Sequence, residues 1–169
     1  MKVLETERLI ISHLTELDAP FFNRLLNSPS WIKYIGDRKV RTDEDAGNYI
    51  RDRIMPSYVL NGFGFYKVSL KDLTPIGICG LVKRDTLEDV DIGFAFLPEF
   101  EGKGYGYESA AEVLNLATST IGLKRIVAIT LKENASSIKL LEKLGLRYER
   151  MIQQHDEELM LMAMELENQ

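Results

Sequence analysis

Hydrophobic and polar positions change their spacing several times along the chain, and each change marks an expected element of secondary structure. Alternating or continuous apolar runs predict strands, whereas apolar residues three and four positions apart predict helices. Strands are expected at 6–14, 64–70, 75–84, 89–97, 124–131, 146–151 and 159–166. Helices are expected at 18–27, 42–60 and 134–144 and from the glycines near residue 104 to about Ile121, with a short helix or turn at 30–35.

The connections between these strands predict how the sheet is assembled. Short links at 71–75 and 85–88 favour an antiparallel meander of the three strands between residues 64 and 97. The strand at 89–97 is instead followed by a helix and then by the strand at 124–131, and such a crossover connection requires a parallel pair. The chain should therefore form a mixed α/β (α+β) fold, with a mostly antiparallel sheet of about seven strands and flanking helices.

A glycine-rich stretch lies where the expected strand ending at Leu97 turns into the long helix. It contains Gly102, Gly104 and Gly106. The start of a helix leaves several backbone N–H groups without partners, and the helix dipole adds roughly half a positive charge there. Glycine admits unusual dihedral angles and lets an anion approach closely. The stretch therefore predicts a phosphate-binding turn made of main chain.

Other glycine motifs fit this stretch less well. A P-loop needs Ser or Thr after its lysine, whereas Lys103 is followed by Gly104. The dinucleotide-binding fingerprint needs a third glycine three positions after the second, where this chain has Tyr107. A tight turn that uses glycine for its geometry alone remains the alternative interpretation.

The composition narrows the possible classes of protein. With 169 residues, 45% of them hydrophobic, the chain is expected to form one globular domain over 1–169. Its net charge of −5 disfavours non-specific binding to nucleic acids. We expect a cytosolic protein, because no apolar signal segment follows Met1 and no run is long enough to cross a membrane. The single cysteine, Cys79, lies in an apolar run and is expected to be a buried thiol.

Several other chemistries have no support in the sequence. His13 and His155 lie far apart, and the lone cysteine completes no metal-binding spacing, so we expect no metal. The absence of a Gly-x-Ser-x-Gly nucleophile elbow argues against a serine hydrolase. Basic residues are scattered and not clustered with aromatic ones, which disfavours RNA binding.

The glycine-rich stretch has the sequence Glu101-Gly-Lys-Gly-Tyr-Gly106 and resembles Gln/Arg-x-x-Gly-x-Gly/Ala, the pyrophosphate-binding motif of the GNAT superfamily of N-acetyltransferases. The preceding Asp91–Phe94 agrees with that superfamily. The opening Leu4–Ile10 and the blocks Asn134–Ser137 and Leu140–Gly145 are similar to the subgroup that acetylates the N-termini of ribosomal proteins. The resemblance covers nearly the whole chain. Glu101 departs from it, because an acid repels a pyrophosphate unless its side chain points away.

The resemblance implies a GNAT fold, in which the two parallel strands are splayed, and acetyl-CoA as the co-substrate. The diphosphate is expected at the glycine turn, and the pantetheine arm is expected to pair with the strand at 89–97 like an added strand. The expected cofactor-binding residues are Phe96, Leu97, Gly102, Lys103, Gly104, Tyr105, Gly106, Asn134 and Ser137. For Asn134, a helix N-cap is the alternative role.

Acetyl transfer to an amine needs a base, a donor to the thioester oxygen and a proton for the departing thiolate. By resemblance, Asp91 is the expected catalytic base, with Asp89 facing the same side, although either residue could instead solvate the start of a strand. The donor is expected to be a backbone N–H at 94–97. Leu141 stands where many family members have a tyrosine acid, so Ser137 is the expected catalytic proton donor, unless it is a solvated first-turn serine.

We therefore predict an acetyl-CoA-dependent N-acetyltransferase whose acceptor, on resemblance alone, is a protein N-terminal α-amine such as that of a ribosomal protein. The helices at 18–60 are expected to form one wall of the acceptor site. The alternatives are an enzyme of the same fold that acts on a small amine or antibiotic, and a non-catalytic acyl-CoA-binding module. The expected partners are acetyl-CoA and the amine acceptor, with no nucleic acid and no membrane, in a monomer or homodimer.

Overall fold

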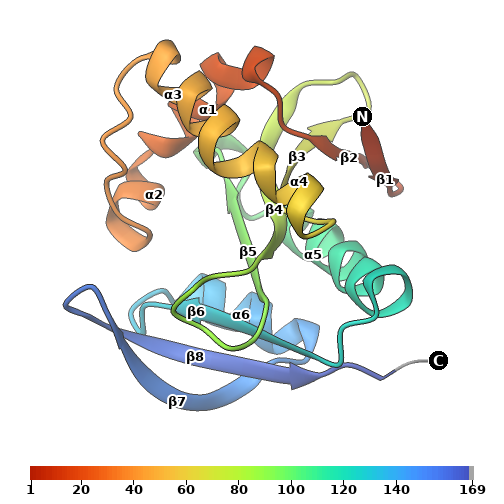
Figure 1. The fold of residues 1–169 in the computed structure, drawn as a ribbon, viewed down its shortest axis with the longest axis vertical. Helices are drawn as coiled ribbons and strands as arrows, with labels where there is room; N and C mark the ends of the chain where they lie inside the picture. The colour runs from red at the N-terminus through yellow and green to blue at the C-terminus, as the bar shows by residue number, and fades with distance from the viewer. Residues whose placement is uncertain (168–169) are drawn as a thin grey trace.

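The computed structural model of the protein describes residues 1–167, and one mixed sheet runs through that part of the chain (Figure 1). Its strands are β1 (Lys2–Glu5), β2 (Leu9–His13), β3 (Phe65–Leu70), β4 (Pro75–Val82), β5 (Asp91–Phe96), β6 (Arg125–Thr130), β7 (Arg147–Gln154) and β8 (Glu157–Glu165). They lie in the order β1-β2-β3-β4-β5-β6-β8-β7, and only β5 and β6 pair in parallel within residues 1–167. The predicted mixed, mostly antiparallel sheet with one parallel pair is confirmed.

The sheet has eight strands, slightly more than the expected number, because β1 pairs with β2 at the edge. This strand has four residues, its ends Lys2 and Glu5 are exposed, and its register shifts between Lys2 and Leu4. A short edge strand with few buried positions gives almost no hydrophobic alternation. For this reason the pattern of the sequence does not reveal it.

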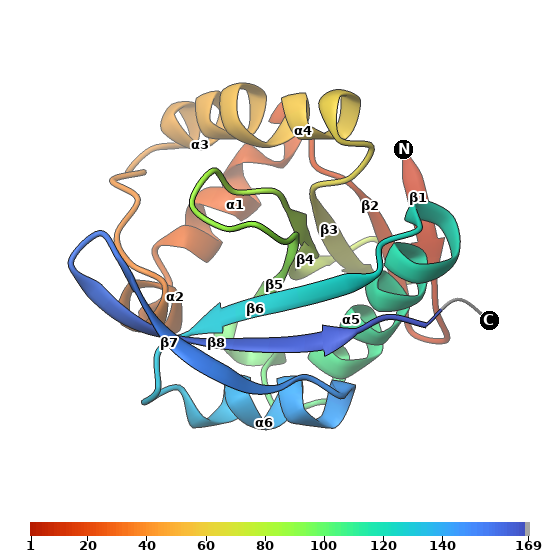
Figure 2. The ribbon, with the colours of Figure 1, turned by 60° about the horizontal axis from the view of Figure 1, so that its bottom comes forward.

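Helices cover both faces of the sheet, as Figure 2 shows: α3 and α4 lie on one side, and α5 and α6 lie on the other. The helices are α1 (Ala19–Leu26), α2 (Pro29–Tyr34), α3 (Asp43–Tyr49), α4 (Met55–Leu60), α5 (Tyr105–Leu116) and α6 (Ala135–Leu144). Short 3₁₀ turns occupy Glu16–Asp18 and Pro98–Phe100, and π-helical turns occupy Ile50–Ile54 and Ala117–Ile121. Each face of the sheet therefore has its own hydrophobic core.

Strand β5 contributes alternate side chains to the two cores. Ile92 and Phe96 belong to the core that includes residues of α5 and α6. Ala95 packs against the core of α1 and α3, and the buried Leu97 just after the strand is part of it. Because side chains alternate along a strand, Asp91 lies on the same face as Ala95, the face of α1–α4.

The helix predicted over 42–60 is present but changes its winding before Pro56. Thr42 caps α3 through a capping box, in which its hydroxyl accepts from the Asp45 N–H and the Asp45 carboxylate accepts from the Thr42 N–H. Pro56 has no N–H to donate to the carbonyl of Asp52. The residues Ile50–Ile54 form a π-helical turn immediately before it, so the helix accommodates the proline by a local widening.

The parallel pair is joined at one end and open at the other. Strands β4 and β5 are paired along their length, from Val82 with Asp91 to Gly77 with Phe96. Strands β5 and β6 meet only where Asp91 lies opposite Val127, next to a hydrogen bond from the Val127 N–H to the Val90 carbonyl. The carboxyl end of β5 therefore has a free edge, and this is the splayed pair that was expected of the fold.

Two further expectations from the sequence concern Cys79 and the ability of the helices to span a membrane. Cys79 is fully buried, as predicted, and burial raises the pKa of its thiol to about 12. Within residues 1–167, every helix is too short or too polar to span a bilayer.

Candidate active site

The glycine-rich turn presents a row of free backbone N–H groups. Among the backbone hydrogen bonds of residues 1–167, none uses the N–H groups of Gly102 to Gly104. The first turn of α5 leaves those of Tyr105 to Tyr107 without an intrahelical partner, and the N–H of Glu108 is the first to bond, to the Gly104 carbonyl at 3.1 Å. Consecutive donors at the positive end of a helix form a binding site for a phosphate-type anion.

The glycines of this turn have two different structural roles. Gly102 and Gly104 have φ angles of +72° and +85°, in the left-handed region that residues with a side chain disfavour. A Cβ at Gly106 would instead lie 2.7 Å from Cδ1 of Leu140 in α6. The first two glycines shape the turn, while Gly106 lets α5 and α6 pack closely.

The carboxylate of Glu101, which departs from the family motif, is directed toward α2. Its Oε1 accepts a hydrogen bond from the Ser30 hydroxyl at 2.9 Å. The neighbouring Glu99 forms an ion pair with Arg24 of α1. These contacts connect the segment before the glycine turn to the helices on the face of α1–α4, and they give the negative charge of Glu101 a partner outside the turn.

The free edge of β5 supplies further backbone donors beside the turn. The Leu97 N–H donates to the Ile76 carbonyl at 2.9 Å, and the Leu97 carbonyl accepts from the Phe100 N–H at 2.9 Å. N–H groups alternate between the two edges of a strand, so those of Phe94 and Phe96 point away from β4. Of the backbone contacts predicted at 94–97, Phe94 and Phe96 have donors on the open edge, whereas Leu97 has no free donor.

Asp91 begins β5 and is a buried carboxylate, only 1% exposed. Its Oδ2 accepts from Nε of Arg84 at 2.6 Å, while its Oδ1 is buried without a hydrogen-bond partner among residues 1–167. Burial raises the pKa of Asp91 above its ordinary value, and Arg84 acts in the opposite direction. Asp91 therefore does not solvate an exposed strand end; it is a buried carboxylate with one oxygen that has no hydrogen-bond partner among residues 1–167.

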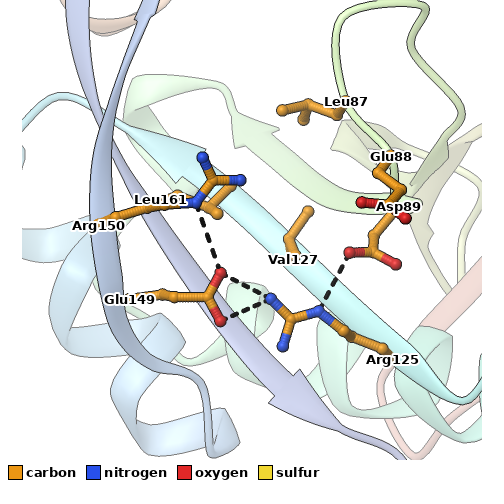
Figure 3. A pocket seen from close by; sticks show the side chains of 8 residues that line it. All are labelled: Leu87, Glu88, Asp89, Arg125, Val127, Glu149, Arg150 and Leu161. Atoms are coloured by element: carbon orange, nitrogen blue, oxygen red, sulfur yellow. Dashed lines mark hydrogen bonds and ion pairs between the residues drawn. The ribbon is translucent and has the colours of Figure 1, made fainter.

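A cavity of about 300 Å³ lies between the connection that precedes β5 and the β7–β8 hairpin (Figure 3), and one of its lining residues, Val127, lies opposite Asp91 in the sheet. It is lined by Leu87, Glu88, Asp89, Arg125, Val127, Glu149, Arg150 and Leu161. The guanidinium of Arg125 donates to Asp89 at 3.0 Å and to both oxygens of Glu149 at 2.6 and 2.7 Å. The lining thus carries both signs of charge, and Asp89, the alternative base, is engaged in an ion pair.

The start of α6 brings Asn134 and Ser137 together. The Asn134 Oδ1 accepts from the Ser137 N–H and from the Ser136 hydroxyl, each at 3.3 Å, so Asn134 is the N-cap of α6. Ser137 is half-buried, and Leu141, one helical turn later, is fully buried in the core. A single face of α6 therefore carries the serine and the leucine, the latter at the position where the resembled family often has a tyrosine.

Two arginines near these groups were missed by the sequence reasoning. Arg84 pairs with Asp91, and Arg8, between β1 and β2, pairs with Glu108 in the first turn of α5 at 2.7 Å. Arg8 lies in the opening block that resembles the family and Glu108 follows the glycine turn by two residues, and their opposite charges were an available signal. Arg84 offers no such signal, because the register of β4 and β5 selects its partner. Within residues 1–167, no group of three or more His, Cys, Asp or Glu residues is arranged to hold a metal ion.

Comparison with known proteins assigns the chain that carries these residues to a known family. The sequence profile described as "Acetyltransferase (GNAT) domain" matches residues 8–147. An uncharacterized N-acetyltransferase of Bacillus subtilis (strain 168), YoaA, is 27% identical over 156 residues, which cover 90% of this chain and 87% of that protein. The match of the profile includes the glycine turn, Asp91 and the start of α6.

Solved structures share the fold over nearly the full length of the chain. The GNAT-family acetyltransferase from Bacillus anthracis has a TM-score of 0.79 and 26% identity, with 98% of each chain covered. The ribosomal-protein α-N-acetyltransferase RimL, solved in complex with coenzyme A, has a TM-score of 0.84 at 13% identity, again with 98% of each chain covered. The second likeness shows the fold alone. The family profile matches most of the length of this chain, and the chain therefore belongs to the GNAT family of acetyltransferases.

Proposed function

We propose that this acetyltransferase transfers the acetyl group of acetyl-CoA to the α-amine of a protein N-terminus, such as that of a ribosomal protein, in the cytosol. The observation that carries the proposal is the row of free N–H groups from Gly102 to Tyr107 beside the open edge of β5. Main-chain donors suit the diphosphate of acetyl-CoA. A free strand edge suits the amide groups of its pantetheine arm.

In this proposal the cofactor-binding residues hold acetyl-CoA along β5 and the two helix starts. Lys103 is exposed beside the turn and supplies a positive charge for the phosphates. Phe96 supplies an edge N–H for the pantetheine arm. Asn134, already the cap of α6, presents its amide group at the other side of the opening, so capping and cofactor binding are compatible roles.

Side chains and backbone N–H groups of this chain can transfer the protons of the reaction and stabilise its negative charge. Asp91 takes the proton of the attacking amine through its unpartnered Oδ1, directly or through a water. The N–H of Phe94 or Phe96 donates to the thioester oxygen as it becomes negative. The Ser137 hydroxyl at the start of α6 gives a proton to the departing thiolate and takes one from solvent in the same step, so the serine stays neutral.

The acceptor assignment is supported by the lining of the cavity beside Asp91. A protein N-terminus presents an ammonium group followed by carbonyl oxygens. The carboxylate of Glu88, which has no ion-pair partner within residues 1–167, can attract the ammonium, whereas that of Glu149 is held by Arg125. The guanidinium of Arg150, which also lies 3.7 Å from Glu149, can donate to a carbonyl. A small amine remains the second candidate, because about 300 Å³ is at the lower end of the volumes of small-molecule sites.

A two-stage experiment tests the proposal. Titration calorimetry with CoA first measures binding, and a thiol-release assay with acetyl-CoA then compares N-terminal peptides of ribosomal proteins with small amines. We expect CoA binding and the highest turnover on a peptide. Turnover on small amines alone would replace the acceptor assignment, binding without turnover would indicate an acyl-CoA-binding module, and no CoA binding would reject the enzyme proposal.

A further inference from the structure

Arg8 lies behind the glycine turn and contacts it at several points. Its Nε donates to Oε1 of Glu108 at 2.7 Å, and its Nη1 donates to the Lys103 carbonyl at 3.1 Å. Its Cζ lies 4.4 Å from the centre of the Tyr105 ring. A Cβ at Gly104 would lie 3.2 Å from its Nη2. One guanidinium from the β1–β2 connection therefore contacts Lys103 and Tyr105 of the turn and Glu108 in the first turn of α5.

The bond to the Lys103 carbonyl fixes the direction of an N–H group. A trans peptide is planar, and its C=O and N–H point to opposite sides. When Arg8 holds the Lys103 carbonyl, the N–H of Gly104 must point away from Arg8. Gly104 has a φ of +85°, and glycine has almost no steric barrier against a rotated peptide. The arginine thus opposes a rotation that the sequence of the turn would otherwise permit.

The same contact neutralises a charge that would oppose anion binding. The Glu108 carboxylate accepts from the Thr6 hydroxyl at 2.5 Å and from the Arg8 N–H at 3.0 Å, in addition to the Arg8 side chain. Burial raises the pKa of Glu108, but these hydrogen bonds outweigh burial and keep the pKa below its ordinary value. Glu108 is therefore ionised in the first turn of α5, where the adjacent guanidinium compensates its charge.

From this geometry we infer that Arg8 is a positioning residue of the cofactor turn: paired with Glu108, it holds the Lys103–Gly104 peptide so that the N–H groups of the turn face the diphosphate of acetyl-CoA. The inference rests on acetyl-CoA binding at the glycine turn. It assigns Arg8 to the affinity for the cofactor and gives it no part in the acceptor site or in proton transfer.

The test compares Arg8→Met and Arg8→Lys with the wild type by titration calorimetry with CoA and by steady-state kinetics. Lysine keeps the charge, but it lacks the planar fork that reaches Glu108 and the Lys103 carbonyl together. We expect the Kd for CoA and the KM for acetyl-CoA to rise about 30-fold in Arg8→Met and about tenfold in Arg8→Lys. The turnover number and the KM for the acceptor should change less than twofold.

Arg41→Met is the matched control, because Arg41 forms a comparable pair with Asp37 at 2.6 Å that does not involve the turn. Its CoA affinity should equal that of the wild type. Wild-type affinity in Arg8→Lys would overturn the positioning role, and equal losses in turnover and in both KM values would overturn it as well. If Arg8→Met does not fold, Arg8→Lys decides. If the wild-type protein fails to bind CoA, the proposed function itself is rejected. If the wild type binds CoA and the Arg8 variants bind it with the same affinity, this inference alone is rejected.

Discussion

The two ends of β5 are built from different chemical groups. At its carboxyl end, the exposed turn from Gly102 to Gly106 offers main-chain N–H groups, which every residue type except proline possesses. At its amino end, Asp91 is 1% exposed and depends on one side chain, Arg84, at 2.6 Å. We therefore expect the cofactor end to be sensitive to changes of backbone conformation, and the Asp91 end to be sensitive to single polar atoms.

The largest expected effect is that of Gly104→Val at the cofactor end. Its φ of +85° costs a residue with a Cβ about 1–2 kcal/mol, so the turn must rearrange. Loss of two or more hydrogen bonds to a charged group, each contributing about 1.5–3 kcal/mol, predicts a CoA affinity lowered by about 10³-fold. Titration calorimetry with CoA measures this change.

Gly122→Val separates ligand binding from backbone strain. Gly122 has a φ of +81°, and a Cβ there would meet no atom within 4 Å. It lies after the π-helical turn that follows α5, away from the glycine turn. The two variants should lose similar thermal stability, and only Gly104→Val should lose CoA affinity. Equal CoA affinity in both variants would contradict the assignment of the turn.

At the Asp91 end we predict that Asp91→Asn lowers the turnover number by about 10²-fold with little change in CoA affinity. Asparagine keeps the size of the side chain but cannot accept a proton. Steady-state kinetics across pH 5–9, with titration calorimetry alongside, distinguishes the two quantities. Wild-type turnover over the whole range would remove Asp91 as the base.

Asp89→Asn is the comparison that assigns the base. Asp89 is bound to Arg125 at 3.0 Å and is about one-third exposed, so we expect its removal to change turnover less than about threefold. A larger loss in Asp89→Asn than in Asp91→Asn would transfer the role of base to Asp89.

Arg84→Met tests the side-chain partner on which Asp91 depends. Asp91 must be ionised to accept a proton, so turnover falls as the pH drops below its pKa. Because Arg84 lowers that pKa, its removal should raise it and move the acidic limb of the pH–rate profile to higher pH. We expect about a tenfold loss of turnover on the acidic side and a smaller loss at high pH. In an Asp91→Asn background, Arg84→Met should leave the profile unchanged.

The same contrast explains what could be predicted from the sequence. The sheet, the parallel crossover and the glycine turn were predictable, because periodicity, connection length and glycine spacing are local properties of the chain. The partners of Asp91 and Glu101, namely Arg84 and Ser30, were not. They come from other elements, and only the register of the strands and the packing of α2 bring them into contact. Strand β1 was missed because it buries too little to show a pattern.

Of the two residues assigned a catalytic role, Ser137 at the start of α6 should show the smaller effect when it is replaced by alanine (Ser137→Ala). A thiol of ordinary pKa, near 8.5, departs readily as the thiolate, so a proton donor adds little to the rate. We expect a turnover number lowered about fivefold, below the typical range for general acids, with unchanged CoA affinity. Ser136→Ala is the control, because the Ser136 hydroxyl bonds the capping Asn134 at 3.3 Å and faces no thiolate in the proposed arrangement. Equal turnover in the two variants would show that Ser137 does not donate a proton to the departing thiolate. The start of α6 would then contribute only the helix cap formed by Asn134.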